Sequence, residues 1–215
     1  MDRVYGRIKD VPYITVILVI MNVILFLICT FTGDLLYNIG EFSPAAFLGK
    51  HQLYRIVMAM FLHADISHLI NNMLLLAGLG AMLEKETGHF RFFFLYIVSG
   101  LGGQAVSMAY KLYANEWYVG SIGASGAVFG LVGVLLAMSF AWTRELENVT
   151  WQRIVFVVVY SLYSGFQAKN IDNAAHMGGL AVGFLLAFGM CLLQRRREDK
   201  RNKHVYGDGW EQRRW

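Results

Sequence analysis

Long apolar runs alternate with short polar connections along the chain, and this pattern predicts its elements. Six runs are long enough to form buried helices, at residues 13–32, 68–83, 92–113, 125–142, 151–166 and 174–193. About 20 apolar residues cross the hydrocarbon core of a bilayer as a helix. A helix also satisfies its own backbone hydrogen bonds, as lipid requires. The pattern therefore predicts an all-α polytopic membrane protein with six transmembrane helices.

Composition supports this fold class and a single domain. Of the 215 residues, 56% are hydrophobic and only 16% are charged, whereas soluble domains average about 25% charged residues. The first apolar run exceeds the roughly 7–15 residues of a signal-peptide core, so we interpret it as a membrane anchor. We predict an N-terminus at 1–12, a membrane domain at 13–193 and a basic tail at 194–215. The connection at 33–67 is expected to be a partly embedded, interfacial segment.

Charge predicts the orientation. Six spans place both termini on one side, and that side carries 15 of the 19 Lys and Arg residues against 4 on the other. The positive-inside rule then makes both termini cytoplasmic. The basic tail is expected to be attracted to anionic lipid headgroups, and no sequence feature indicates binding to nucleic acid. With no organelle-targeting extension evident, we expect a bacterial cytoplasmic membrane, with a eukaryotic secretory membrane as the alternative.

Candidate chemistry gathers in one layer. The second, fourth and sixth spans all begin at the outer face, and His68, Asn72, Ser125 and His176 lie near their starts. At 1.5 Å rise per residue, each is within roughly 10 Å of its helix's outer end. The topology therefore predicts that these side chains share one depth in the membrane.

Ser125 and His176 are candidates for a nucleophile and its base. A serine hydroxyl is a poor nucleophile without a base within about 2.6–3.2 Å. Glycine faces on both helices would allow that approach, although small residues in membrane helices commonly serve packing alone. The glycines concerned are Gly123, Gly126 and Gly130 around Ser125, and Gly179 and Gly183 on the His176 face.

His68 and Asn72 are candidates for an oxyanion hole. They are four residues apart and so lie on one helix face. Their N–H groups, with the Ser125 backbone N–H, could stabilise negative charge on a carbonyl oxygen. The alternative is an interhelical hydrogen-bonded pair. His63 is expected to tie down the first loop, and Asp172 lies at the outer rim, so we expect a Ser–His dyad without a third member.

With these residues in order, the sequence resembles the rhomboid family of intramembrane serine proteases, from about Tyr54 to Gly183. The matching stretches are Tyr54-Arg55, where the family commonly has Trp-Arg; His63-x4-His68-x3-Asn72, with Glu84 after Gly80; Gly123-Ala124-Ser125-Gly126; and Asn173-Ala174-Ala175-His176-Met177-Gly178-Gly179 with Gly183.

The resemblance implies a rhomboid-like six-helix bundle, and it assigns roles to the residues. Ser125 would be the nucleophile, His176 the base, and His68, Asn72 and the Ser125 N–H the oxyanion hole. The enzyme would cut single-span membrane proteins near the extracytoplasmic end of their membrane segment, without a cofactor or metal. Phe129 stands where many members have Tyr; its ring would pack on His176, so activity should survive.

Three other classes remain as alternatives. A zinc protease could use His63, His68 and His176, but the sequence has no His-Glu-x-x-His motif. A transporter could use the same polar layer, and would often show internal repeats that are not evident. An inactive rhomboid-like protein would bind transmembrane clients without cutting them, and the complete Ser, His and Asn set argues against it.

Overall fold

The computed structural model describes residues 11–141, 159 and 171–206. Within these ranges, four helices are long and apolar enough to cross a membrane: α2 (Tyr13–Thr32), α5 (Ile66–Thr87), α6 (His89–Tyr113) and Asn173–Arg201 of α9 (Asn173–Tyr206). The helix α7 (Ser125–Ala141) is apolar but shorter. The all-α polytopic class is confirmed. The predicted fifth span at 151–166 lies outside the described residues except for 159, so the count of six stays a prediction.

Most predicted helix bounds agree with the structure to within one residue. α6 begins at His89, three residues before the predicted start at 92, and α5 and α9 also differ at polar ends. α5 begins two residues before the predicted start and continues through Thr87, since Asp65 caps its first turn by accepting from the His68 backbone N–H at 2.8 Å. α9 does not end at 193 but continues to Tyr206. The basic tail therefore begins as helix, because Arg, Lys, Gln and Glu are good helix formers.

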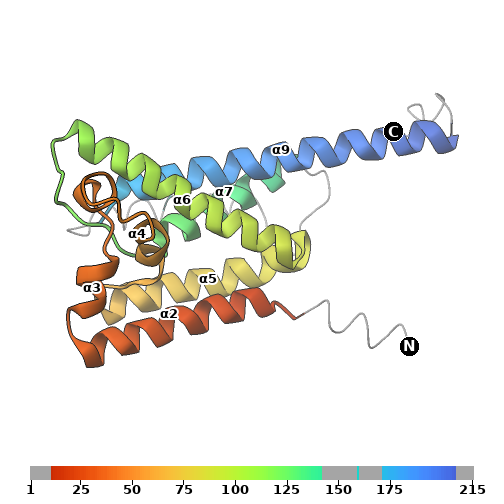
Figure 1. Cartoon of the computed structure of the whole chain (residues 1–215). Helices are drawn as coiled ribbons and strands as arrows, with labels where there is room; N and C mark the ends of the chain where they lie inside the picture. The colour runs from red at the N-terminus through yellow and green to blue at the C-terminus, as the bar shows by residue number, and fades with distance from the viewer. Residues whose placement is uncertain (1–10, 142–158, 160–170, 207–215) are drawn as a thin grey trace.

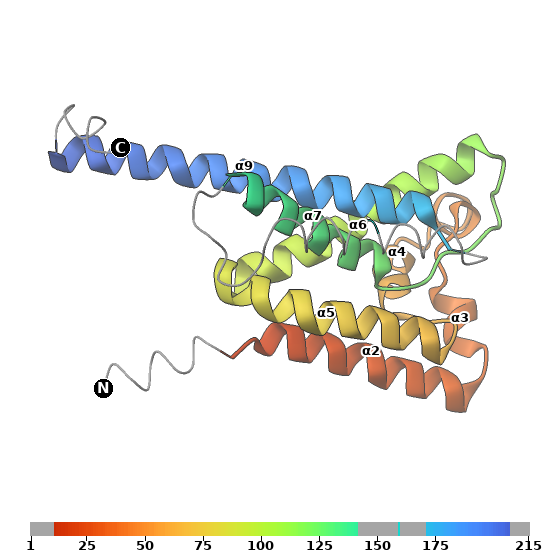
Figure 2. The same ribbon diagram turned by 180° about the vertical axis from the view of Figure 1, so that it is seen from behind.

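Figure 1 shows how the helices are arranged. α2 lies beside α5, while α6, α7 and α9 pack against one another. α2 begins, and α9 ends, on the same side of the bundle, which we call the terminal end. α5, α7 and α9 all begin at the opposite end of the bundle, as the view from behind in Figure 2 also shows. We call this the site end. The shared layer that the topology predicts thus corresponds to one end of the bundle.

The first loop, predicted as interfacial, covers the site end with short helical segments: α3 (Leu35–Gly40), a π turn η1 (Ala45–Gly49), α4 (Arg55–Met58) and a 3-10 turn η2 (Ala59–Phe61). Arg55 holds this loop together by donating to the carbonyl oxygens of Glu41 at 2.9 Å and Asn38 at 2.8 Å. Two residues of the loop itself, Phe42 and Leu62, are fully buried. The loop therefore forms part of the packed core rather than a loose connection.

α7 and α9 approach until their backbones touch. A Cβ atom added at Gly179 would lie 1.9 Å from the Gly126 carbonyl oxygen, and one at Gly183 would lie 2.1 Å from that of Gly130. Only glycine fits such a contact, since any side chain would overlap a backbone atom. The glycine faces thus bring the two helices together as their spacing predicts.

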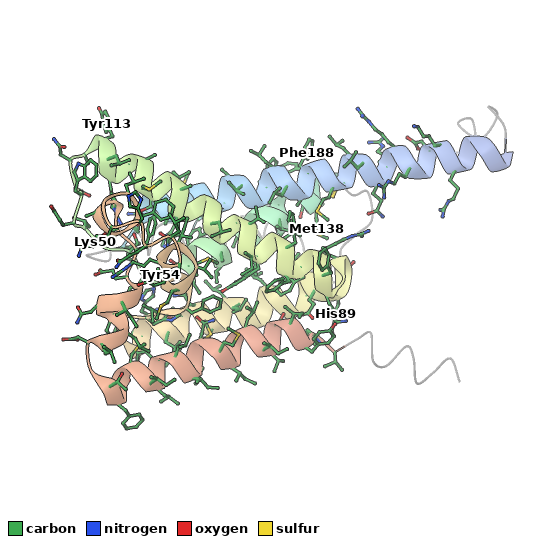
Figure 3. All side chains as sticks on the ribbon, viewed as in Figure 1. Lys50, Tyr54, His89, Tyr113, Met138 and Phe188 are labelled. Atoms are coloured by element: carbon green, nitrogen blue, oxygen red, sulfur yellow. The ribbon has the colours of Figure 1, made fainter. Side chains whose placement is uncertain are left out.

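At the terminal end, a buried carboxylate joins α2, α5 and α6. Glu84 accepts from the backbone N–H groups of Ile14 at 2.9 Å and Thr15 at 2.8 Å, and from the Thr15 hydroxyl at 2.7 Å. It also pairs with the His89 ring, labelled in Figure 3. The first turn of any helix leaves N–H groups without an intrahelical acceptor. Glu84 supplies the acceptor for α2.

Candidate active site

The segment before α7 is held on both sides by the first loop. The Ser121 N–H donates to the Phe42 carbonyl at 2.8 Å, and the Phe42 N–H donates back at 3.2 Å. The Gly123 N–H donates to the carbonyl of Ala59 at 2.8 Å. We call residues 120–124 the nucleophile segment, because they lead directly into Ser125, the first residue of α7.

Gly123 brings this segment against His68. Its φ of +128° is a conformation that L side chains rarely adopt. A Cβ atom there would lie 2.8 Å from Cε1 and Nε2 of His68 and 3.6 Å from Ser125 Oγ. The structure therefore places His68, Gly123 and Ser125 together, and Gly123 is needed for both backbone angle and space.

His176 lies one turn into α9, against α7. Its ring stacks on Phe129 with centroids 4.3 Å apart and planes 8° apart, and 6% of the residue is exposed. Within the described residues, no hydrogen bond joins Ser125 to His176, and Nδ1 of His176 has no partner. Catalytic hydrogen bonds are often long in unliganded enzymes and shorten when substrate binds. The stacking on Phe129 agrees with the sequence prediction of ring contact.

Asn72 lies on the His68 face of α5, but its amide is engaged within the helix. The Nδ2 atom donates to the His68 carbonyl oxygen at 2.9 Å, and the residue is buried. An asparagine amide carries two hydrogens, so a second donor remains. Its role in an oxyanion hole stays a prediction, as does any role of Asn173, which begins α9.

His63 is fully buried beside His68, with ring centroids 5.0 Å apart. Burial, followed by the neighbouring His68 ring, lowers the pKa of His63 to about 4, so its ring is neutral near pH 7. Neither ring nitrogen has a partner among the described residues. Its backbone carbonyl, not its ring, holds the loop by accepting from the Tyr37 hydroxyl at 2.6 Å.

A cavity of about 10 Å³ adjoins Ser125, and its polar lining comes from Gln104, Ser121, Ser125 and Asp172. That volume is on the order of one water molecule. Gln104 is buried on α6, and its Oε1 atom has no partner in the described part of the chain. The sequence analysis did not select Gln104.

A polar cluster around Asp172 also adjoins this cavity; Asp172 was predicted only to lie at the outer rim, and its partners Ser107 and Lys111 were not predicted from the sequence. Asp172 accepts hydrogen bonds from the hydroxyls of Ser107 and Ser121 and lies 3.1 Å from the Lys111 ammonium. Lys111 also donates to Ser121. Burial raises the pKa of Asp172, but the hydroxyl bonds and the Lys111 charge outweigh this and hold the pKa below its ordinary value. One helical face of α6 carries three polar residues at the spacing i, i+3, i+7, namely Gln104, Ser107 and Lys111. This polar stripe on an apolar helix is the sequence signal that could have identified them.

The chain is similar to known proteins over most of its length. Residues 50–193 match the rhomboid domain. RHOMBOID-like protein 1 of Arabidopsis thaliana is 34% identical over 155 residues, covering 71% of this chain and 38% of that protein. RHOMBOID-like protein 2 of the same plant is 38% identical over 159 residues, covering 73% and 48%. Rhomboid protease GluP of Bacillus subtilis (strain 168) is 28% identical over 186 residues, covering 84% and 35%.

The chain thus spans between about a third and a half of the length of these three relatives. The rhomboid domain, by contrast, covers well over half of this chain. The resemblance seen in the sequence is confirmed, and the chain belongs to the rhomboid family.

Proposed function

We propose that the protein is an intramembrane serine endopeptidase, with Ser125 as nucleophile and His176 as base. One observation carries the proposal. The His176 ring is fixed against Phe129, one helical turn from Ser125, in a helix pair whose backbones touch at Gly126 and Gly179. A base held on a rigid, closely packed helix is what an otherwise weak serine nucleophile requires.

The reaction would proceed by acyl transfer. His176 accepts the Ser125 hydroxyl proton as Oγ attacks the peptide carbonyl carbon, and the carbonyl oxygen becomes negative. The Ser125 N–H, in the first turn of α7, has no intrahelical acceptor and lies at the positive end of the helix dipole. His68, whose ring lies against Gly123, would supply a side-chain donor. The departing amine takes the proton from His176, and a water then hydrolyses the acyl-enzyme with His176 as base.

The neighbouring cavity suits the second half-reaction. It adjoins Ser125 and is on the order of one water in volume. The buried Gln104 Oε1 atom offers an acceptor there. A water held beside the acyl group would need to lose its proton to His176, which does not itself line the cavity but directly follows Ala175, which does.

Membrane orientation completes the proposal. The six-span bundle would lie in a bacterial cytoplasmic membrane with both termini cytoplasmic, so that the site end faces outward. The enzyme would then cut single-span proteins near the extracytoplasmic end of their membrane segment. Helical peptide bonds must unwind before attack, so substrates with Gly or Pro near the cut should be favoured, because these residues cost about 1 and 3 kcal/mol in a helix.

Cleavage of a panel of single-span proteins in liposomes tests the proposal. Wild type should release products whose termini, read by mass spectrometry, lie near the extracytoplasmic end. Ser125→Ala and His176→Ala should each abolish cleavage, and the double variant should be no worse, because the pair acts as a unit. Substantial cleavage by Ser125→Ala would refute the nucleophile assignment, and cuts at the cytoplasmic end would refute the orientation.

A second candidate is a protein that binds transmembrane clients without cutting them. The absence of a Ser125–His176 hydrogen bond among the described residues favours it. Such a protein would retain intact clients equally well in wild type and Ser125→Ala. A zinc protease has less support, because the described residues include no group of three or more His, Cys, Asp or Glu side chains that could hold a metal ion.

A further inference from the structure

Three separate elements meet at Asp172. Ser107 and Lys111 come from the site end of α6, Ser121 comes from the nucleophile segment, and Asp172 immediately precedes α9. Lys111 is 4% exposed, although lysine is rarely buried. We call these four residues the Asp172 cluster. A largely buried ion pair beside the candidate site calls for a reason beyond composition.

The two carboxylate oxygens of Asp172 serve different elements. Oδ1 accepts from the Ala175 N–H at 2.9 Å and so caps the first turn of α9, which carries His176. Oδ2 accepts from Ser107 and Ser121, and Lys111 lies 3.1 Å from it. One carboxylate therefore connects α9, which carries His176, to the segment that leads into Ser125.

Ser121 is also fixed from its other side. Its backbone N–H and carbonyl both pair with Phe42 of the first loop, while its hydroxyl contacts Lys111 and Asp172. Only three residues separate Ser121 from Ser125, so a displacement of Ser121 moves the chain leading into the nucleophile. The cavity beside Ser125 is lined by Ser121 and Asp172 as well.

We propose that the Asp172 cluster is a positioning device, in which Lys111, Ser107 and Ser121 hold Asp172 so that Ser125 and His176 keep their relative placement. This rests on the proposed function. A misplacement of about 1 Å can cost on the order of 100-fold in rate, and precise sites need supporting residues whose own positions are locked. The cluster acts through Ser125 and His176 and does not itself contact the substrate.

Lys111 is the member whose removal is most informative. Lys111→Met leaves the Asp172 carboxylate without its cation, and an uncompensated buried charge is unfavourable. The carboxylate should then protonate or shift, and its bond to Ser121 should weaken. Replacing both charges, in Lys111→Met with Asp172→Asn, removes that penalty and should restore part of the activity. Lys111→Arg keeps the charge and should restore more.

The test measures kcat and KM in liposomes together with hydrogen exchange of residues 119–126. Lys111→Met and Ser121→Ala should lower kcat by about 10–100-fold with KM changed less than about 3-fold, and exchange in this segment should rise. The matched controls are Lys50→Met, an exposed lysine, and Ser139→Ala, which lies at the far end of α7. Both should behave as wild type.

An increase in KM with kcat unchanged would overturn the proposal and assign the cluster to substrate binding. A fall in melting temperature with kcat and exchange both unchanged would also overturn it, since the role would be stability alone. If the folded wild-type protein cleaves no substrate, the proposed function is refuted, whatever the cluster does. Hydrogen exchange then decides separately, because unchanged exchange in Lys111→Met would refute positioning regardless of activity.

Discussion

The two ends of the helix bundle bury polar groups in opposite ways. At the terminal end, the Glu84 carboxylate receives hydrogen bonds from Ile14, Thr15 and His89. At the site end, both ring nitrogens of His63, Nδ1 of His176 and Oε1 of Gln104 are buried without partners in the described part of the chain.

Native proteins satisfy most buried polar groups, so unsatisfied ones require an explanation such as a catalytic role or a bound water. The hydrogen bonds of Glu84 are explained by its structural role, because they connect α5 to α2 and α6. The groups without partners at the site end have no such explanation, and Gln104 lines the cavity beside Ser125. Other such groups, among them Asn22 Oδ1 on α2 and the Tyr96 hydroxyl on α6, lie outside the cavity lining. Under the proposed function, one end would maintain the fold, while the other would keep hydrogen-bonding groups available for a substrate.

Removal of Phe129 should produce the largest effect at the site end. Phe129→Ala leaves the His176 ring unsupported and empties a buried position, at a cost of about 3–5 kcal/mol in the free energy of unfolding. Turnover per folded molecule should fall as well, whereas Phe129→Tyr should be tolerated. Phe140→Ala, at a residue 76% exposed on the same helix, is the control. An Ala variant with full turnover would remove Phe129 from the site.

The α7–α9 contact should be nearly as sensitive. Gly179→Ala places a methyl group 1.9 Å from a backbone oxygen of α7, so the helices must separate, at a cost of about 3 kcal/mol. Cleavage should fall because Ser125 and His176 lie on these two helices. Gly189→Ala meets nothing within 4 Å and should leave melting and cleavage unchanged. Equal behaviour of the two variants would contradict the close contact.

A change at Glu84 should separate stability from activity. Glu84→Gln replaces an acceptor of several hydrogen bonds by a group that is partly a donor, and should lower the free energy of unfolding by about 2 kcal/mol. The variant should melt earlier yet keep wild-type kcat below its melting temperature. Glu86→Gln, exposed two residues later, is the control. A selective loss of kcat would show that the two ends are not independent.

The smallest effect concerns pH. The His63 pKa of about 4 lies below its ordinary value of 6.5, so the unfolded chain binds more protons between these values. The contribution to stability is therefore complete above pH 6.5 and is lost as pH falls towards 4, by about 1 kcal/mol from pH 7 to 5.5. His63→Gln should flatten this dependence in thermal melting, and His51→Gln, at an exposed site, should not. Identical slopes in all three proteins would refute a neutral buried His63.

Features that depend on one helix could be predicted from the sequence. The bounds of α2, the start of α7 at Ser125 and the glycine faces follow from hydrophobic runs and helical spacing. The stacking of Phe129 on His176 follows from the same spacing once α7 and α9 are paired. Residues at fixed helical intervals share a face whatever the rest of the chain does.

Features that depend on distant segments could not be predicted. Lys111 and Asp172 are 61 residues apart by number, and neither residue alone indicates the other. Asn72 was expected to present its donors to the site, yet it uses one on the carbonyl of its own helix. The turns of the first loop follow from contacts with Phe42 and Arg55 rather than from a local pattern.

Covalent labelling by a fluorophosphonate tests the central claim most directly, because only an activated serine should react. Wild-type protein in liposomes should be labelled at Ser125, identified by mass spectrometry of the peptide, and His176→Ala should abolish the labelling while the protein stays folded. The inactive variant Ser125→Ala should show no label at any other serine. Labelling that persists in His176→Ala, or that falls on a residue other than Ser125, would contradict the Ser125–His176 dyad.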